Sequence, residues 1–508
     1  MFVFQDSQLD PILGLIITHM TPQRSPSQKP VPANLLFLMA RYAHYHMTGA
    51  LLGDLLTKAM DRINDVVEHH QWDMTMLAFW ISNATLLLHY LKKDAGLVQS
   101  TSQFQLELSE LINEIFILII RDAERRMDKV LGEAVLEHET IPGLDEIAFQ
   151  GEWNVFKSKT KTPELPLEKR FRPPSPKRRA QTSPRNITSL LSSTLFVLDL
   201  YDVHSVITSQ IVAQLFYWLG AELFNQVITT KRYLSRTKAM QIRMNVSALE
   251  DWARSNNRRP EHYENGSSTT TGEGVVDAAR RHLAPVIQLL QWLQCFTSLG
   301  QDHESLVGTL TQLQRLSPTQ LIHAVKSYRP EVGEKGLAKV HMKFLVQLQK
   351  GQETLIRRPL TPTPADAMSS ASGDATPAAA KPNKTSKQQQ NGIDGSSSTT
   401  TTSQNPVPSI PPLLEVESDS PGNKYQITID PSQMLPFSLP TSTDMLITYG
   451  AGIGGMNRER ARKYIPTVPT EVLSKLNLDG SDGQTEGRKT STGTVGTTAQ
   501  GWRNGNAI

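Results

Sequence analysis

The sequence predicts an all-α fold, and three observations indicate that class. Apolar residues recur every three or four positions over two long blocks, which is the period of amphipathic helices. Serines that could cap a helix, Ser247 and Ser317, stand before two of the periodic runs. Extended-looking segments are confined to two short pieces, KYQITID (424–430) and DMLITYG (444–450). Helices therefore have to form the core.

Composition limits how much of the chain can fold. Its 508 residues are enough for two or more domains, but only 38% of them are hydrophobic, against roughly 45–50% in a typical globular protein. The deficit must lie in segments too polar to offset the entropy lost on ordering. The net charge of +3 is too small for the field of a general nucleic-acid binder, so nucleic acid is not an expected partner.

The single cysteine and the N-terminus bear on the compartment. Cys295 cannot form an intramolecular disulfide or a thiolate zinc cluster, which favours a reducing compartment. It lies in the apolar run LLQWLQCF, so we expect a buried structural thiol rather than a nucleophile. The N-terminus carries Asp6 and Asp10 and lacks the basic region of a signal peptide. The apolar stretch 106–120 is shorter than the ~20 residues of a membrane span and is expected to be a core helix.

Residues 1–150 form the first helical block. Apolar residues at helical spacing predict amphipathic helices over 35–46 and 51–66. A third run, 77–91, places apolar side chains on more than one face, so it has to be central in a bundle. Trp80, in this run, is expected to anchor the core.

Residues 151–186 contain several prolines and no helical period, and are expected to be a basic linker. No acidic residue interrupts the segment RFRPPSPKRRAQTSPR (170–185). Three interpretations stay open: contact with an anionic membrane, a nuclear-import or nucleic-acid signal, and an inert linker. Ser175 and Ser183 each precede a proline, and phosphorylation there would add up to about −2 charge per site and weaken an electrostatic contact.

Residues 187–350 form the second helical block. Its strongest helix, over 207–227, repeats an apolar residue at successive i+4 steps. Ser247 with Glu250, and Ser317 with Gln320, match the capping box, so each serine is predicted to begin a helix. Trp252 is expected to be a second core anchor.

The rest of the chain is expected to be irregular. Residues 351–420 are rich in Thr, Ser, Ala, Gln, Asn and Pro, and are expected to be a disordered insert. Residues 421–477 contain the extended-looking pieces and a proline-punctuated stretch, and we expect them to pack along the helices as a strap. Residues 478–508 are expected to be a disordered tail.

Two motifs could carry chemistry, but their context argues against it. Residues 450–455 read G-x-G-x-x-G, yet no βαβ unit of the kind that binds a dinucleotide follows them. His44 and His46 point to different faces of one helix, and no cysteine or close carboxylate completes a metal site with them or with His69 and His70. We therefore expect no cofactor, no metal and no enzymatic activity.

Three parts of the chain resemble one family. The segment LFNQVITTKRYLSRTKAMQIRMNVSALEDWARSNN (223–257) resembles the most characteristic stretch of the dilute domain in class V myosin tails, where Leu-Ser, Lys-x-x-Gln and Asn-Val-Ser-x-Leu-Glu-x-Trp recur in this order. LSPTQL (316–321) resembles a later helix start of that domain. PANLLFLMARYAHY (32–45) and FWISNATLLLHYLK (79–92) look like the first half of the same cargo-binding tail. The resemblance covers residues 9–350 and, more loosely, 434–476.

The resemblance implies an elongated stack of helical bundles that docks vesicle adaptors and Rab-type small GTPases. It also implies that Lys238 and Gln241 belong to the partner-binding surface. Because these two residues are one helical turn apart, we expect them to share an exposed face, together with Tyr233, Arg236 and Arg243. A solvated helix face without a partner is the alternative.

The chain also departs from the myosins, since it contains no motor domain, light-chain-binding repeats or coiled-coil heptads. It looks more like the stand-alone dilute-domain proteins of fungi, some of which carry ankyrin repeats that this sequence lacks. The chain is either a tail-only protein or a shortened gene product. Its expected function is that of a non-catalytic cargo-binding adaptor in myosin V-like transport, in the cytoplasm and peripherally on Golgi or vesicle membranes. The alternative is a cortical or cytoskeletal scaffold that uses the basic linker to contact membrane.

Overall fold

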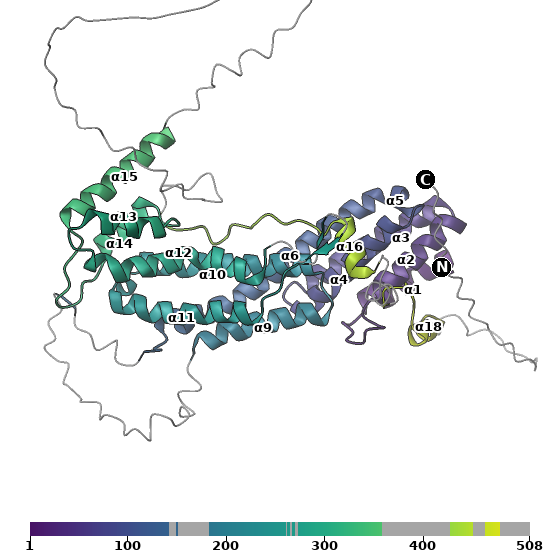
Figure 1. The fold of residues 1–508 in the computed structure, drawn as a ribbon. Helices are drawn as coiled ribbons and strands as arrows, with labels where there is room; N and C mark the ends of the chain where they lie inside the picture. The colour runs from purple at the N-terminus through teal and green to yellow at the C-terminus, as the bar shows by residue number, and fades with distance from the viewer. Residues whose placement is uncertain are drawn as a thin grey trace, which may run out of the picture.

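The computed structural model describes residues 1–141, 149–150, 182–260, 262–264, 267–269, 273–357, 427–450 and 463–477. These residues form an elongated rod of helices (Figure 1), which confirms the predicted all-α class. Their one sheet is a two-stranded antiparallel hairpin of β1 (His262–Glu264) and β2 (Ser267–Thr269). Most of the predicted linker and insert and all of the predicted tail lie outside the described residues, and so does Ser175. The glycine motif of the predicted strap lies outside them beyond Gly450.

The first half of the rod, residues 1–141, is built around α4 (Met74–Lys93), which packs against α2 and α6. α4 is the one described helix that could cross a membrane by length and composition, but 89% of its apolar window is buried inside the fold. Trp80 lies in this core, as predicted. The other elements are η1 (Asp6–Gln8), α1 (Leu9–Leu13), η2 (Gly14–Thr18), α2 (Val31–His46), α3 (Gly49–His69), α5 (Leu97–Ser100), α6 (Ser102–Leu131) and η3 (Gly132–Glu137).

The second half of the rod, residues 182–357, is built around α10 (Ser205–Thr229), which packs against α12 (Val275–Cys295). A Cβ atom at Gly220 would collide with the carbonyl oxygen of His282, so this glycine allows the close approach of the two helices. Trp252 is buried, as predicted, and donates to Ser192 Oγ at 2.7 Å. The other elements are α9 (Pro184–Leu200), η5 (Lys231–Tyr233), α11 (Arg236–Ser255), η6 (Phe296–Ser298), α13 (His303–Gln312), α14 (Pro318–Ser327) and α15 (Lys339–Arg357).

The two predicted helix starts have different outcomes. Ser317 caps α14, with Gln320 completing the capping box, as predicted. The prediction for Ser247 is wrong, because this serine lies inside α11 and donates to the carbonyl oxygen of Met244 at 2.7 Å. The actual N-cap is Ser235, whose hydroxyl accepts from the Lys238 N–H. Buried apolar residues continue at helical spacing across Ser247, so the helix does not end there.

Residues 427–450 and 463–477, which we call the strap, follow the rod from α14 to the first half (Figure 1). The extended piece predicted over 444–450 is wrong, because residues 442–449 form the helix α16 (Ser442–Tyr449). Thr441 caps it in a capping box with Asp444, and Met445 and Tyr449 are buried one turn apart. A short apolar run alone does not distinguish a strand from a helix. The strap ends in α18 (Thr470–Asn477).

The structure also moves the predicted ends of the second helical block and changes the predicted burial of Cys295. α9 begins at Pro184, before the predicted start of the second block, and Ser183 is its N-cap residue. α15 continues to Arg357, past the predicted limit at residue 350. Cys295 is half-buried rather than fully buried, and this burial raises the pKa of its thiol to about 11.

Candidate functional site

The structure buries two of the five residues that were expected on an exposed partner-binding face. Tyr233 is only 4% exposed. Its hydroxyl donates to Glu137 and accepts from Arg232 at 2.7 Å. The expectation of exposure is wrong here because η5 turns the ring inward, toward the end of η3.

Gln241 is buried as well, with 1% of its surface exposed. Its side-chain amide donates to the carbonyl oxygen of His138 at 3.0 Å and accepts from the N–H of Ile141 at 3.1 Å. One turn later, Asn245 donates to the carbonyl oxygens of Val135 and His138 at 2.8 and 2.9 Å. The two amides clamp the segment that leaves η3, so Gln241 acts on the protein's own backbone and shares no exposed face with Lys238.

A different part of α11 remains accessible. Arg236 is exposed, Lys238 and Arg243 are half-buried, and Arg243 pairs with Glu250 at 2.8 Å. Met240 and Met244, which the sequence analysis missed, are 37% and 48% exposed. Their i, i+4 spacing places them on one face of α11, so two exposed thioethers lie next to each other there. We call Arg236, Met240, Arg243 and Met244 the α11 face, because their i, i+3 and i+4 spacing places them along one side of the helix. Lys238 stands two residues before Met240 and so lies roughly 160° around the helix from it, toward the buried side, which makes the prediction that it belongs to one exposed face wrong.

A buried carboxylate fixes the beginning of α11. Glu331 accepts from the N–H of Thr237 at 2.8 Å and from its hydroxyl at 2.7 Å. Arg329 donates its N–H to the carbonyl oxygen of Leu234 at 2.8 Å. A carboxylate at a helix N-terminus is favoured by the unpaired N–H groups there. Sequence reasoning could not find this contact, because 94 residues separate Glu331 from Thr237.

The strap is held on α10 by three amide side chains. Gln210 both donates to the carbonyl oxygen of Ser438 and accepts from its N–H, each at 2.8 Å. Asn225 makes the same pair of bonds with Ile429, at 2.6 and 2.8 Å. Gln214, between them, donates to the carbonyl oxygen of Gln433 at 3.0 Å and accepts from the Leu435 N–H at 2.8 Å. We call Gln210, Gln214 and Asn225 the amide row.

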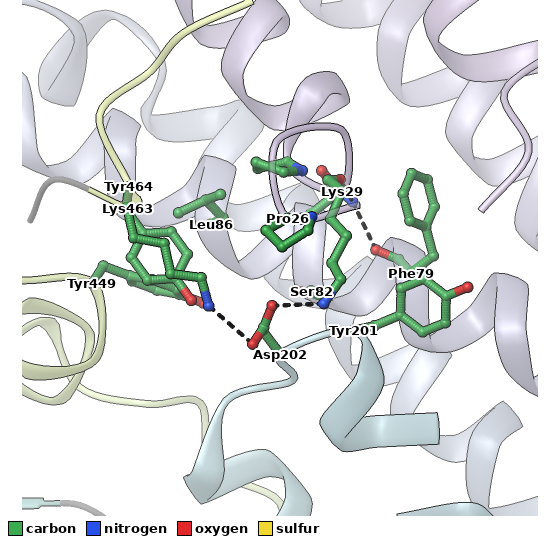
Figure 2. Close-up of a pocket in the computed structure, with 12 residues that line it drawn as sticks. Pro26, Lys29, Phe79, Ser82, Leu86, Tyr201, Asp202, Tyr449, Lys463 and Tyr464 are labelled. Atoms are coloured by element: carbon green, nitrogen blue, oxygen red, sulfur yellow. Dashed lines mark hydrogen bonds and ion pairs between the residues drawn. The ribbon is translucent and has the colours of Figure 1, made fainter. Parts of the chain in front are cut away.

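The two halves of the rod and the strap meet at a small pocket (Figure 2). Asp202, at φ 54°, binds Lys29 of the first half and Lys463 of the strap, each at 3.1 Å. The rings of Tyr449 and Tyr464 lie 4.9 Å apart on the strap side. The pocket's volume of about 20 Å³ suits roughly one water molecule, against ~300 Å³ or more for a small-molecule site. The pocket is therefore a junction rather than a ligand site.

Two histidines pack around Tyr449 of the strap. His204 Nδ1 accepts from the Val206 N–H at 3.2 Å, so its Nε2 carries the proton and donates to Thr448 Oγ1 at 2.9 Å. The ring of His89 lies 5.0 Å from that of Tyr449. Burial lowers the pKa of His89 to about 3, with a smaller effect of nearby Lys93. The imidazole of His89 is therefore neutral at pH 7.

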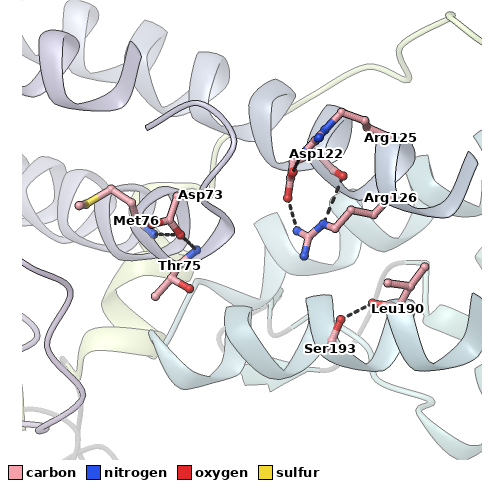
Figure 3. Close-up of polar contacts among 8 residues, drawn as sticks. All are labelled: Asp73, Thr75, Met76, Asp122, Arg125, Arg126, Leu190 and Ser193. Atoms are coloured by element: carbon pink, nitrogen blue, oxygen red, sulfur yellow. Dashed lines mark hydrogen bonds and ion pairs between the residues drawn. The ribbon is translucent and has the colours of Figure 1, made fainter. Parts of the chain in front are cut away.

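Another polar cluster stabilises the contact between α6 and the loop before α4. Asp122 is 1% exposed and pairs with Arg125 and Arg126, while Asp73 caps α4 through the N–H groups of its first turn (Figure 3). The Arg125 guanidinium also lies 4.6 Å from the ring centre of Trp72. The cluster neutralises a buried carboxylate, which would otherwise be costly to desolvate.

The histidines considered as metal ligands have other neighbours. His46 Nε2 lies 3.0 Å from the sulfur of Met1, and the rings of His69 and His70 pack edge to face. The ring of His44 packs against Tyr45. Among the described residues, no group of His, Cys, Asp or Glu side chains could hold a metal ion.

Comparison with known protein families gives a match in the second half of the rod. Residues 210–332 match the model of the DIL domain. The matched range begins at Gln210, the first member of the amide row, and ends directly after Glu331, so it includes the α11 face and its supports. The fold and this match define a helical binding protein built around a DIL domain.

Relatives extend the similarity beyond that domain. A dilute domain-containing protein of Schizosaccharomyces pombe is 35% identical over 351 residues, which cover 68% of this chain and 58% of that protein. A dilute domain-containing protein of Saccharomyces cerevisiae is 23% identical over 465 residues, covering 67% and 52%. Human unconventional myosin-Va is 26% identical over 317 residues, covering 59% of this chain and 15% of the myosin. The chain thus spans little more than half the length of the two yeast relatives.

Solved structures of myosin tails are also similar. Apo Myo2-GTD aligns at 14% identity with a TM-score of 0.49, over 73% of this chain and 92% of that one. A myosin V cargo binding domain aligns at 14% identity with a TM-score of 0.47, over 69% and 84%. Residues 210–332 are thus similar to the DIL domain, and about two thirds of the chain resembles the dilute domain-containing proteins of the two yeasts. The DIL domain is a binding module without catalytic activity.

Proposed function

We propose that this protein is a cargo-binding adaptor in myosin V-like transport, which captures Rab-type small GTPases or vesicle or Golgi adaptor proteins through the α11 face. The composition of that face carries the proposal, since Met240 and Met244 lie beside Arg236 and Arg243. Methionine adapts to irregular partner surfaces, and arginine is enriched at the residues that dominate binding energy.

The support behind the α11 face favours binding. Glu331 fixes the first turn of α11, and Gln241 and Asn245 fix its inner side. A preformed surface loses less entropy when it binds. The two arginines of the face fit a partner with an acidic patch, because complementary charge steers encounter and sets register.

The location follows from the proposed partners. The protein acts in the cytoplasm and peripherally on Golgi or vesicle membranes, where the GTPases and adaptors would hold it. Residues 151–186 would add contact with an anionic membrane surface through their basic residues.

A capture experiment tests this function. The immobilised full chain is offered purified Rab-type GTPases loaded with GTP or GDP, beside an Arg236→Glu variant and a control, Lys129→Glu, which changes an exposed lysine on α6. We expect GTP-selective capture by the wild type and the control, and loss of capture by Arg236→Glu. If the folded wild type captures no GTPase in either state, the proposal fails. The scaffold alternative then predicts flotation of the chain with anionic vesicles.

A further inference from the structure

The amide row binds the strap in the way that a β-strand binds its neighbour. Each amide offers one donor and one acceptor, and Gln210 and Asn225 each satisfy both backbone groups of one strap residue. Tyr217 adds a bond from its hydroxyl to the carbonyl oxygen of Asp430 at 2.7 Å. Most of these contacts are made with the main chain, although Tyr217 also donates to the side-chain oxygen of Gln433 at 3.1 Å and Ser438 Oγ lies 3.4 Å from that of Gln210. They therefore select mainly an extended backbone.

An aromatic contact adds selectivity for a side chain of the strap. The ring of Phe437 lies 4.3 Å from that of Phe116 on α6, directly before the residue that Gln210 binds. We call the side chains that hold this part of the strap the seat, and none of them carries a charge; they are Phe116, Tyr217 and the amide row. The seat therefore fits an extended segment of low charge with an aromatic residue at this position.

The bound segment is held only at the surface. Over 430–439 exposed and half-buried residues alternate, with the half-buried Leu435 and Phe437 facing the rod, and no residue of 427–439 is fully buried. The next segment differs, because Met445 and Tyr449 of α16 are buried in the core. Residues 427–439 can therefore leave the seat while α16 stays docked.

We propose that the amide row and Phe116 form a peptide-binding groove, which residues 427–439 fill within the chain and which an extended, weakly charged, aromatic-bearing segment of a partner protein fills in their place. This groove lies on α10 and α6 and is independent of the α11 face. The strap then sets the threshold for the partner, because a segment in the same molecule competes at high effective concentration.

Fluorescence anisotropy tests the groove, with a labelled synthetic peptide of the strap sequence ITIDPSQMLPFSLP as the probe. The full chain is used as the wild type and as Phe437→Ala, which weakens the internal competitor. We expect the probe to bind Phe437→Ala at least about tenfold more tightly than the wild type, the ratio that corresponds to about 1.4 kcal/mol. The same peptide with alanine in place of its phenylalanine should bind at least about tenfold more weakly.

Variants of the seat complete the test. In the Phe437→Ala background, Gln210→Leu with Gln214→Leu should abolish probe binding, while Gln347→Leu, an exposed glutamine on α15, should not change it. Leucine is close to glutamine in size, and circular dichroism and melting temperature confirm folding before the titration. Absence of saturable binding to Phe437→Ala, or equal binding with and without the two amides, overturns the proposal.

Discussion

The side chain of Gln241 donates to the carbonyl oxygen of His138 at 3.0 Å, across the junction between α11 and the segment after η3. The same amide accepts from the Ile141 N–H, so it satisfies both kinds of backbone group there. A residue that resembles part of a partner-binding motif therefore fastens the protein to itself. Its substitution should affect stability before it affects binding.

Replacing Gln241 by alanine tests that difference. The change leaves the Ile141 N–H without its partner, at a cost of about 1–3 kcal/mol if it stays buried, while the His138 carbonyl keeps its bond from Asn245. We expect a lower melting temperature, with GTPase capture at 25 °C retained by the folded fraction. Arg236→Glu, on the exposed side of α11, should show the reverse, with a near-normal melting temperature and lost capture. Equal loss of capture in two equally stable variants would show that Gln241 contacts the partner.

Trp252 should be one of the most sensitive positions for stability. Its ring is buried against Phe216, with ring centres 6.0 Å apart, and its indole N–H is bonded to Ser192. We expect Trp252→Ala to lower the free energy of unfolding by roughly 3–5 kcal/mol, measured by chemical denaturation. The matched control is Trp72→Ala, because Trp72 is 51% exposed. Similar losses for both variants would contradict the assigned core.

His89 should make the fold sensitive to acid. Its pKa in the folded protein is lowered to about 3 by burial, whereas the unfolded value is 6.5. The unfolded state therefore binds the extra proton first, and stability falls as pH drops from 6.5 toward 3, by up to about 1.4 kcal/mol per pH unit. Above pH 6.5 the effect is absent. In His89→Leu, the melting temperature should fall less between pH 7 and pH 5 than in the wild type, and an unchanged slope would refute the assignment.

Glu124 should act in the opposite direction. Burial, with the nearby Glu222, raises the pKa of Glu124 to about 7 although Arg121 opposes the shift. The folded state then holds the proton more tightly, so stability is lost as pH rises from 4.5 to 7. Glu124→Gln should raise the melting temperature at pH 8 and leave it nearly unchanged at pH 4. Glu110→Gln, on the exposed face of α6, is the control and should have no effect at either pH.

The helices of both blocks could be predicted because burial of one face imposes a 3.6-residue period on the sequence. The run over 207–227 lies inside α10, and Trp80 and Trp252 are buried as expected. The cap at Ser317 was also readable, since the whole capping box lies within four residues. At Ser247 the same local pattern occurs inside a helix, and only the apolar residues on both sides of it distinguish the two cases.

The site was less predictable, because it depends on contacts between distant segments. Exposure of Tyr233 and Gln241 is decided by η3 and the segment after it, about a hundred residues earlier in the chain. The amide row left one weak signal, namely uncharged amides at 210, 214 and 225 on one side of a largely apolar helix. Its meaning required the strap, more than two hundred residues later.

The central claim is that the α11 face binds the partner, and an equilibrium affinity measurement tests it most directly. Biolayer interferometry would compare a GTP-loaded Rab-type GTPase on the wild type, on Met244→Asp and on Met47→Asp, which places the same charge on a methionine of similar exposure (45% against 48%) after α2. We predict that Met244→Asp weakens binding at least about tenfold while Met47→Asp keeps wild-type affinity. Equal affinities for all three proteins would contradict the assignment of the α11 face.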